Sequence, residues 1–244
     1  MWGSVPPHPA PMHTPSPGPF ARSLSPLSAL AMFVAFAPPA LLSAEPAPAS
    51  AAEGEGWVLV SRSEKLTVFK RPRKDSNIQE VKAVGLIEAT PIVIKRVLDD
   101  TAEYPKFMPY VTESRVISRD GDSIIGYQRV SPPLISDRDY TMRIRSETRR
   151  NATGGTCYCN RWEPANHLGP AEKSGVARVK INEGYWLLEP VNEARHTQAT
   201  YSLHCDSGGS LPAAVVNAAN RTAIPKIFDG IRKQAKLAKY SAEK

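Results

Sequence analysis

The chain has 244 residues, a formal net charge of +7 at pH 7 and three cysteines. It contains no P-loop, no Rossmann glycine motif, no zinc-ligand spacing and no aromatic-basic nucleic-acid motif, so we expect no cofactor, no metal site and no nucleic-acid partner. The surplus of basic residues fits either a solvated surface or weak, transient attraction to an anionic membrane.

The N-terminal segment has the pattern of a secretory signal peptide. Residues 27–37 (LSALAMFVAFA) are uninterruptedly apolar, and as a helix they would span roughly 16 Å, about half of a bilayer's hydrocarbon core. Pro38 and Pro39 end the run, and small residues suited to cleavage follow. We predict a signal peptide and a disordered Pro/Ala-rich linker over 1–52, with export to the periplasm or beyond. An uncleaved anchor, or a downstream start that would leave the protein cytoplasmic, is the alternative.

Residues 53–244 are predicted to form one domain that begins with two strands and a helix. Residues 66–71 (LTVFKR) and 78–87 (IQEVKAVGLI) alternate apolar and polar side chains at period two. Thr90 and Pro91 suit the N-cap and first position of a helix. Residues 104–110 (YPKFMPY) hold two prolines, so only a short helical turn is expected there.

The middle of the domain is predicted to be an antiparallel sheet. Strands separated by Gly, Asp or Asn turns are expected at residues 111–118, 123–130, 140–149, 156–162, 176–190 and 195–205. One face of these strands is apolar and the other polar, as in a sheet with one solvated side. On the last strand, His204 is expected to point to solvent. Cys157, Cys159 and Cys205 are expected to be free thiols, buried or half-buried.

A long C-terminal helix is predicted to cover the apolar face of the sheet. Ser210 is the expected N-cap, Pro212 lies in the first turn, and Pro225 is expected to kink or break the helix, which continues to Ala238. Its polar face is basic and either is solvated or docks on an anionic membrane. The predicted fold is therefore α+β, a curved antiparallel sheet wrapped around this helix.

The segment 131–140 (SPPLISDRDY) is unusual for a loop between strands. Its Pro-Pro pair excludes a tight two-residue turn and stiffens the loop. Leu134 and Ile135 at the tip need an apolar surface to contact. We therefore interpret residues 131–137 as a lid and call them the lid loop.

These segments together resemble the START (StAR-related lipid-transfer) domain family of the helix-grip superfamily. The stretches that carry the resemblance follow one another over nearly all of residues 57–239: 99–109 (DDTAEYPKFMP), 133–140 (PLISDRDY), Trp162, 175–179 (GVARV), 184–190 (GYWLLEP) and 206–217 (DSGGSLPAAVVN). The resemblance implies an internal hydrophobic tunnel that holds one lipid, gated by the lid loop and the C-terminal helix. It implies no invariant catalytic set.

The resemblance and the inward faces of the strands give a set of candidate ligand-binding residues. They are Phe107, Met108, Tyr127, Leu134, Ile135, Arg138, Met142, Ile144, Trp186, Leu188, Tyr201, Leu203, Val216 and Asn217. Leu134 and Ile135 either cap the tunnel or pack on the helix without a ligand. Arg138, flanked by Asp137 and Asp139, is expected to form a structural salt bridge that pins the lid; contact with an acidic headgroup is the alternative.

We predict a monomeric, non-catalytic lipid carrier or sensor whose ligand is a sterol, fatty acyl chain or phospholipid. A superfamily enzyme such as a polyketide cyclase or aromatase is the alternative. It would need a general acid or base in the tunnel, for which His196, His204 and Asp206 are the candidates. Nothing specific favours a scaffold or protein-binding module.

Overall fold

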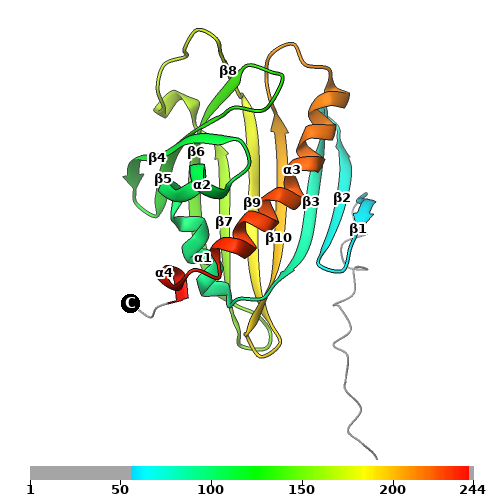
Figure 1. The fold of residues 1–244 in the computed structure, drawn as a ribbon, viewed down its shortest axis with the longest axis vertical. Helices are drawn as coiled ribbons and strands as arrows, with labels where there is room; N and C mark the ends of the chain where they lie inside the picture. Colours follow the sequence, from blue (N-terminus) through cyan, green and yellow to red (C-terminus); the bar gives the residue numbers. More distant parts are fainter. Residues whose placement is uncertain (1–55, 242–244) are drawn as a thin grey trace, which may run out of the picture. The chain divides into compact units, whose positions relative to one another are not determined.

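A computed structural model of the chain describes residues 56–241 and shows an α+β domain (Figure 1). The predicted signal peptide and linker lie outside the described residues. The strands are β1 (Val58–Arg62), β2 (Leu66–Arg73), β3 (Ser76–Ile87), β4 (Val111–Asp120), β5 (Ser123–Val130), β6 (Asp137–Arg150), β7 (Thr156–Pro164), β8 (Val176–Arg178), β9 (Ile181–Val191) and β10 (His196–Asp206). The helices are α1 (Pro91–Asp99), η2 (Thr101–Glu103), α2 (Tyr104–Phe107), η3 (Asn166–Leu168), α3 (Ala213–Gln234) and α4 (Ala238–Ser241).

The strands of the described region form one sheet in the order β1-β2-β3-β10-β9-β7-β6-β5-β4. All neighbours in this order are antiparallel, and β10 at the centre joins the N-terminal strands to the later meander. Tyr201 of β10 lies opposite Ala83 of β3 and Trp186 of β9, which places these residues on one face. This inner face is covered by α3, which runs across β9 and β10 in Figure 1. The predicted helix-grip fold is confirmed.

Close contact between α3 and its neighbours depends on two glycines. A Cβ at Gly85 of β3 would lie 2.6 Å from Cε1 of Phe228, and one at Gly230 of α3 would lie 2.7 Å from the carbonyl oxygen of Phe107. Phe228 is therefore able to pack directly onto the sheet, where it is fully buried with Ile224 and Ile231.

The stretch 176–190, predicted as one strand, is two strands. Val176–Arg178 (β8) leaves the antiparallel order and pairs in parallel with the start of β6, where Asp137 lies opposite Val176. The antiparallel strand β9 begins only at Ile181. The physical reason is the anchoring of β8 to β6, since Arg178 binds Asp139 and the amide of Val179 donates to the carbonyl of Asp139 at 2.9 Å.

The C-terminal helix differs from the prediction at both ends. Its N-cap is Pro212 rather than Ser210, and in the described structure no side chain caps the helix. The helix continues through Pro225, ends at Gln234 and is followed by the separate helix α4, which contains Ala238. Burial of the apolar side chains on both sides of Pro225 accounts for its continuity, because tertiary packing stabilises a helix more than propensity does.

The outer face of the sheet is less solvated than the alternating pattern predicts. His204 is only 4 % exposed, so the expectation that it points to solvent is wrong. Its Nδ1 lies 3.3 Å from a carboxylate oxygen of Glu183, which also pairs with Arg73 at 3.3 Å. The neighbouring Ser202 donates to Glu80 at 2.8 Å. Long side chains of adjacent strands thus cover the centre of this face.

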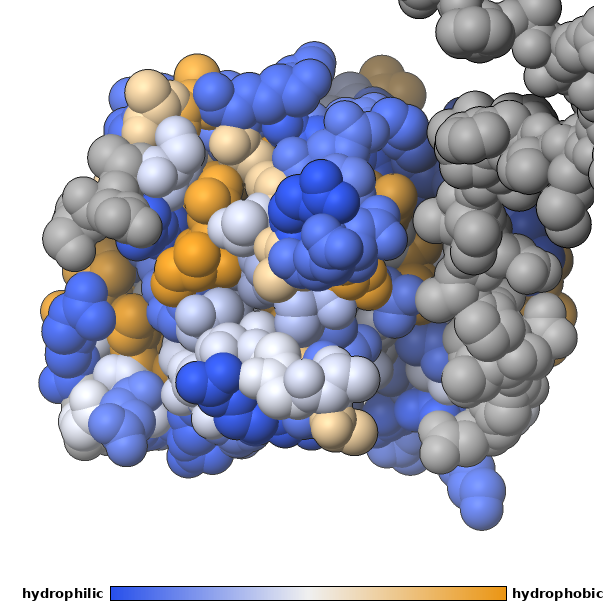
Figure 2. Space-filling model, turned by 90° about the horizontal axis from the view of Figure 1, so that it is seen from below, coloured by the Kyte–Doolittle hydropathy of each residue, from blue (hydrophilic) through white to orange (hydrophobic). Residues whose placement is uncertain are grey.

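Seen from below, the described surface is mostly hydrophilic, with small and separate hydrophobic groups (Figure 2). Among residues 56–241, no helix is both long enough and apolar enough to cross a membrane. All three cysteines are free, as predicted; Cys157 and Cys159 are buried and Cys205 is half-buried.

Candidate functional site

A cavity of about 290 Å³ lies between the inner face of the sheet and α3. The segment before β4 and the lid loop close it on the other sides. Most of its lining side chains are aliphatic or aromatic, because alternation along each strand sends every second residue to this face. The cavity is therefore a place where an apolar molecule is removed from water.

An aromatic cluster forms one wall of the cavity. The ring of Tyr201 lies 4.5 Å from that of Trp186 and 5.8 Å from that of Trp162, measured between centroids. The indole nitrogen of Trp162 donates to Asn182 at 3.0 Å. Trp186 also contacts Phe228 of α3, with centroids 5.3 Å apart. These contacts fix the wall between sheet and helix.

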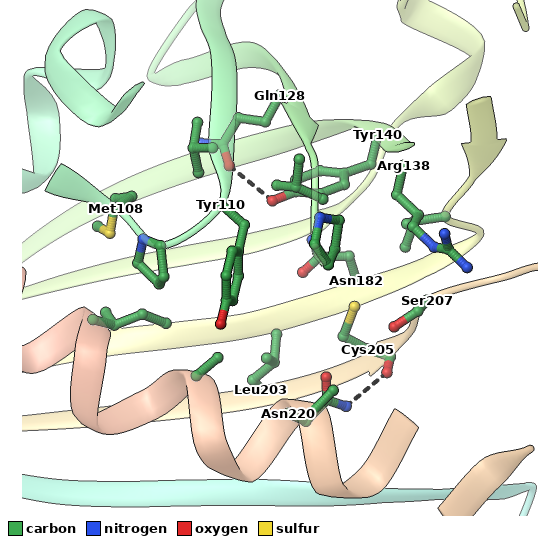
Figure 3. Close-up of a pocket in the computed structure, with 18 of the residues that line it drawn as sticks. Met108, Tyr110, Gln128, Arg138, Tyr140, Asn182, Leu203, Cys205, Ser207 and Asn220 are labelled. Atoms are coloured by element: carbon green, nitrogen blue, oxygen red, sulfur yellow. Dashed lines mark hydrogen bonds between the residues drawn. The ribbon is translucent and has the colours of Figure 1, made fainter. Parts of the chain in front are cut away.

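Several polar groups of the cavity are hydrogen-bonded, and among the described lining residues only Arg138 is charged. Tyr140 donates to the side-chain oxygen of Gln128 at 2.8 Å, and Asn220 donates to the carbonyl of Cys205 at 2.9 Å (Figure 3). Burial raises the pKa of Tyr140 and Tyr201 and raises the pKa of the Cys205 thiol to about 12. These groups therefore stay neutral at physiological pH.

The base of the lid loop is held by Asp137, the first residue of β6. Its carboxylate accepts hydrogen bonds from the hydroxyl of Ser131 and from Nε of Arg129, the latter at 2.8 Å. The hydrogen bond from Ser131, followed by that from Arg129, holds the pKa of Asp137 below its usual value. The two ends of the lid loop are thereby tied together.

Asp139 holds β8 against β6. Its carboxylate accepts hydrogen bonds from Nε of Arg178 at 2.7 Å and from the hydroxyl of Tyr127 at 3.2 Å. Asp139 and the guanidinium of Arg178 are both almost completely buried. The hydrogen bond with Asp139 raises the pKa of Arg178, so its guanidinium stays charged.

Arg138 does not form the predicted salt bridge, because both flanking carboxylates are bound to other arginines. Its Nη1 donates to the carbonyl oxygen of Ser136 and to its hydroxyl, the latter at 3.1 Å. Arg138 is 4 % exposed, its Nε has no hydrogen-bond partner among residues 56–241, and its side chain lines the cavity.

Nine of the predicted ligand-binding residues line the cavity. They are Met108, Ile135, Arg138, Met142, Ile144, Trp186, Tyr201, Leu203 and Val216. The structure thus brings the lid, the sheet and the helix together around one space. Whether these side chains contact a ligand stays a prediction.

Two predicted residues face away from the cavity. Tyr127 lies on the other face of β5, where its ring is 4.9 Å from the guanidinium carbon of Arg115, while its neighbour Gln128 lines the cavity. Leu134 is fully exposed and has a left-handed backbone conformation with φ 69°. This conformation turns its side chain to solvent, so of the two aliphatic residues it is Ile135 that lines the cavity, together with Pro132 of the lid loop.

Three further predicted residues belong to the packing around the cavity. Leu188 is buried in the main hydrophobic cluster, and Phe107 packs against it beside α3. The side chain of Asn217 accepts a hydrogen bond from the amide of Gln79 at 2.8 Å and so fastens α3 to β3. None of the three is part of the lining.

The sequence reasoning missed much of the wall formed by the C-terminal helix. The lining includes Leu211, Val215, Ala219, Ala223 and Ile227, which recur every four residues. This spacing places them on one face of a helix and could have been found in the sequence. Tyr140 was also missed, although it alternates with Met142 and Ile144.

Among the described residues, no general acid or base of the usual kind faces the cavity. Its lining contains no Asp, Glu, His or Lys among the described residues. His196 lies at the β9–β10 turn, where its Nδ1 is 2.9 Å from Asn192, and Asp206 accepts a hydrogen bond from the amide of Gly208 at 3.0 Å. Within residues 56–241, no group of three or more His, Cys, Asp or Glu is placed to hold a metal ion.

Solved structures with the same fold include lipid transfer proteins. A STAR-related lipid transfer protein fragment from Xanthomonas axonopodis superposes with a TM-score of 0.65 at 23% identity, over 75% of this chain and 100% of that chain. Human StAR-related lipid transfer protein 5 gives a TM-score of 0.65 at 19% identity, over 77% and 89% of the two chains. At these identities the similarity shows the fold.

Sequence comparison extends over the same region. An uncharacterized protein of Pseudomonas aeruginosa is 23% identical over 182 residues, which cover 74% of this chain and 87% of the relative. The model of the START domain family matches residues 47–241, which include every element that builds the cavity. This chain therefore belongs to the START domain family.

Proposed function

We propose that the protein binds one lipid in the cavity and carries it between membranes without catalysing a reaction on it. The observation that supports this most directly is the mostly apolar cavity between sheet and helix. Each Å² of apolar ligand surface taken out of water there contributes roughly 25 cal/mol. Membership of the START family supports the same ligand class.

The lining supports a carrier more than a cyclase. Acid–base catalysis needs a group that gains or loses a proton near neutral pH. Burial raises the pKa of Tyr140, Tyr201 and Cys205 in the lining, and an arginine guanidinium does not give up its proton in a protein. The described lining therefore offers no group poised for this work.

The test is to extract the purified protein with organic solvent and identify what is released by mass spectrometry. A lipid at a near-stoichiometric amount is expected. Ala223→Trp fills the cavity from α3 and should lower the lipid content, whereas Ala218→Trp lies on the same helix outside the lining and should leave it unchanged. An empty protein that also fails to take up fluorescent lipids contradicts the proposal.

We further propose that exchange takes place outside the cytoplasm, at a membrane that the lid loop touches. The apolar run and small residues at the N-terminus support export. The fully exposed Leu134, next to the cavity-lining Ile135, supports a lid that meets a membrane. Sequencing the N-terminus of the protein from its periplasmic fraction tests the first part, and an intact N-terminus in the cytoplasm contradicts it.

A further inference from the structure

Among the described residues, the cavity contains a single charged side chain, and that side chain forms no ion pair within 4 Å. Arg138 is the one charged residue among the described lining residues. Both carboxylates beside it are bound elsewhere, Asp137 to Arg129 and Asp139 to Arg178. Within residues 56–241, the guanidinium of Arg138 donates its hydrogen bonds to the carbonyl and hydroxyl oxygens of Ser136, which are neutral.

A buried guanidinium of this kind needs a counter-charge. Arginine keeps its charge at any physiological pH, so it does not escape burial by losing a proton. Burial of a charge without a partner is unfavourable, and Nε of Arg138, which has no partner in the described part of the chain, leaves a donor unused as well. An incoming anion would satisfy both the charge and the donor.

The surroundings of Arg138 are suited to an acidic group. Arg138 alternates with Tyr140 and Met142 on the inner face of β6. Figure 3 shows Arg138, Asn182 and Ser207 towards one end of the cavity, with Met108 at the other end. Asn182 and Ser207 carry further hydrogen-bond donors, and no carboxylate lines the cavity in the described structure to repel an anion.

We propose that the ligand is an amphiphile whose acidic head, a carboxylate or a phosphate, binds Arg138 while its apolar tail extends towards Met108. The proposal rests on the proposed function of lipid binding and narrows the ligand class. One unmatched cation calls for one anionic group. The volume of about 290 Å³ is at the small end of the range for ligand pockets, which favours a single tail over a two-chain phospholipid.

The test compares ligands that share a tail and differ in the head. The full chain, freed of lipid, is titrated with oleate, oleyl phosphate and oleyl alcohol, and binding is followed by the fluorescence of Trp162 and Trp186 in the wall. One of the acids should bind about tenfold or more tighter than the alcohol, because a site built to bond a charged group loses that bond with the alcohol. Which of oleate and oleyl phosphate binds more tightly shows whether the preferred head is a carboxylate or a phosphate.

Variants separate the charge from the fold. Arg138→Met should weaken binding of the acids about tenfold or more and leave the alcohol unchanged, since a structural defect would weaken all three ligands alike. Arg145→Met removes the same charge from the exposed outer face of the same strand and should change nothing. If Arg138→Met does not fold, comparing the affinities of the unmodified chain for the acids and the alcohol still tests whether the site prefers an acidic head.

Different negative results contradict different proposals. Equal affinity for the acids and the alcohol overturns the acidic-head proposal and leaves lipid binding intact. Recovery of a neutral sterol as the sole co-purified lipid has the same meaning. No binding of any of the three ligands, together with an empty solvent extract, overturns the proposed function itself.

Discussion

Leu134 and Ile135 are consecutive residues with opposite environments. Ile135 lines the cavity, while Leu134 is fully exposed in a left-handed conformation. A leucine in this conformation is strained, and nothing in the described structure covers its side chain. The exposed leucine therefore contributes little to the stability of the folded domain, which makes it a useful probe of function.

Leu134→Asp should slow lipid transfer between anionic vesicles without destabilising the protein. Exposed substitutions away from packing contacts change the free energy of unfolding by about 0.5 kcal/mol or less. Transfer is measured with a fluorescent lipid, and stability by chemical denaturation. Val116→Asp, at a partly exposed position on β4, is the control. If Leu134→Asp lowered the stability as much as the transfer rate, the result would show that the lid loop has only a structural role.

Asp137→Asn should weaken the base of the lid in a pH-dependent way. The pKa of Asp137 is lowered in the folded protein, so its contribution is present above the unfolded value of about 3.9 and is lost as the pH falls through the folded value. The variant should therefore be less stable than the parent at pH 7 and equal to it at strongly acidic pH. Denaturation curves at both pH values, with Asp122→Asn as a control in the β4–β5 turn, measure this. A difference that persists in acid would contradict the assignment.

At the scale of elements, α3 forms one wall of the cavity and part of the core. One face of the helix, with Val215 and Ala223, lines the cavity, whereas Phe228 and Ile231 on another face are fully buried. Gly85 allows Phe228 to lie directly on β3. One face of α3 thus contributes to the stability of the domain, and another face lines the cavity.

Phe228→Ala should destabilise the domain by about 3–5 kcal/mol, the usual cost of emptying a fully buried phenylalanine site. The loss includes the contact with Trp186. Lys233→Ala, exposed on the same helix, should change the free energy of unfolding by about 0.5 kcal/mol or less. Thermal or urea unfolding measures both, and a loss for Phe228→Ala no larger than that of the control would show that α3 does not anchor the core.

At the scale of the whole molecule, the domain combines an apolar cavity with polar networks at its edges. Residues far apart in the chain form these networks: Arg178 and Asp139 are 39 positions apart, and Asn217 reaches Gln79 over 138 positions. The networks fix the lid base and the helix to the sheet. The cavity between them is therefore a product of the assembled fold and of no single segment.

The sequence by itself determined the family, the α+β fold, the position of most strands and the closing helix. Period-two alternation and helical spacing depend only on local geometry, and they correctly placed Met142, Ile144, Tyr201 and Leu203 around one space. The same local rules placed Tyr127 on the wrong face, because its neighbours Gln128 and Val130, not the more apolar-looking tyrosine, line the cavity.

Only the tertiary structure decided which charges meet. In the sequence, Asp137 and Asp139 look like the ion-pair partners of Arg138. Alternation along β6 instead points Arg138 into the cavity and the two aspartates away from it. There Asp137 binds Arg129 and Asp139 binds Arg178. The separate strand β8, which delivers Arg178, and the burial of His204 also depend on partners distant in the chain. Charged side chains pair with residues on neighbouring strands, and the sequence does not reveal which strands are neighbours. Because the two aspartates pair with other arginines, Arg138 is left in the cavity without an ion pair in the described structure.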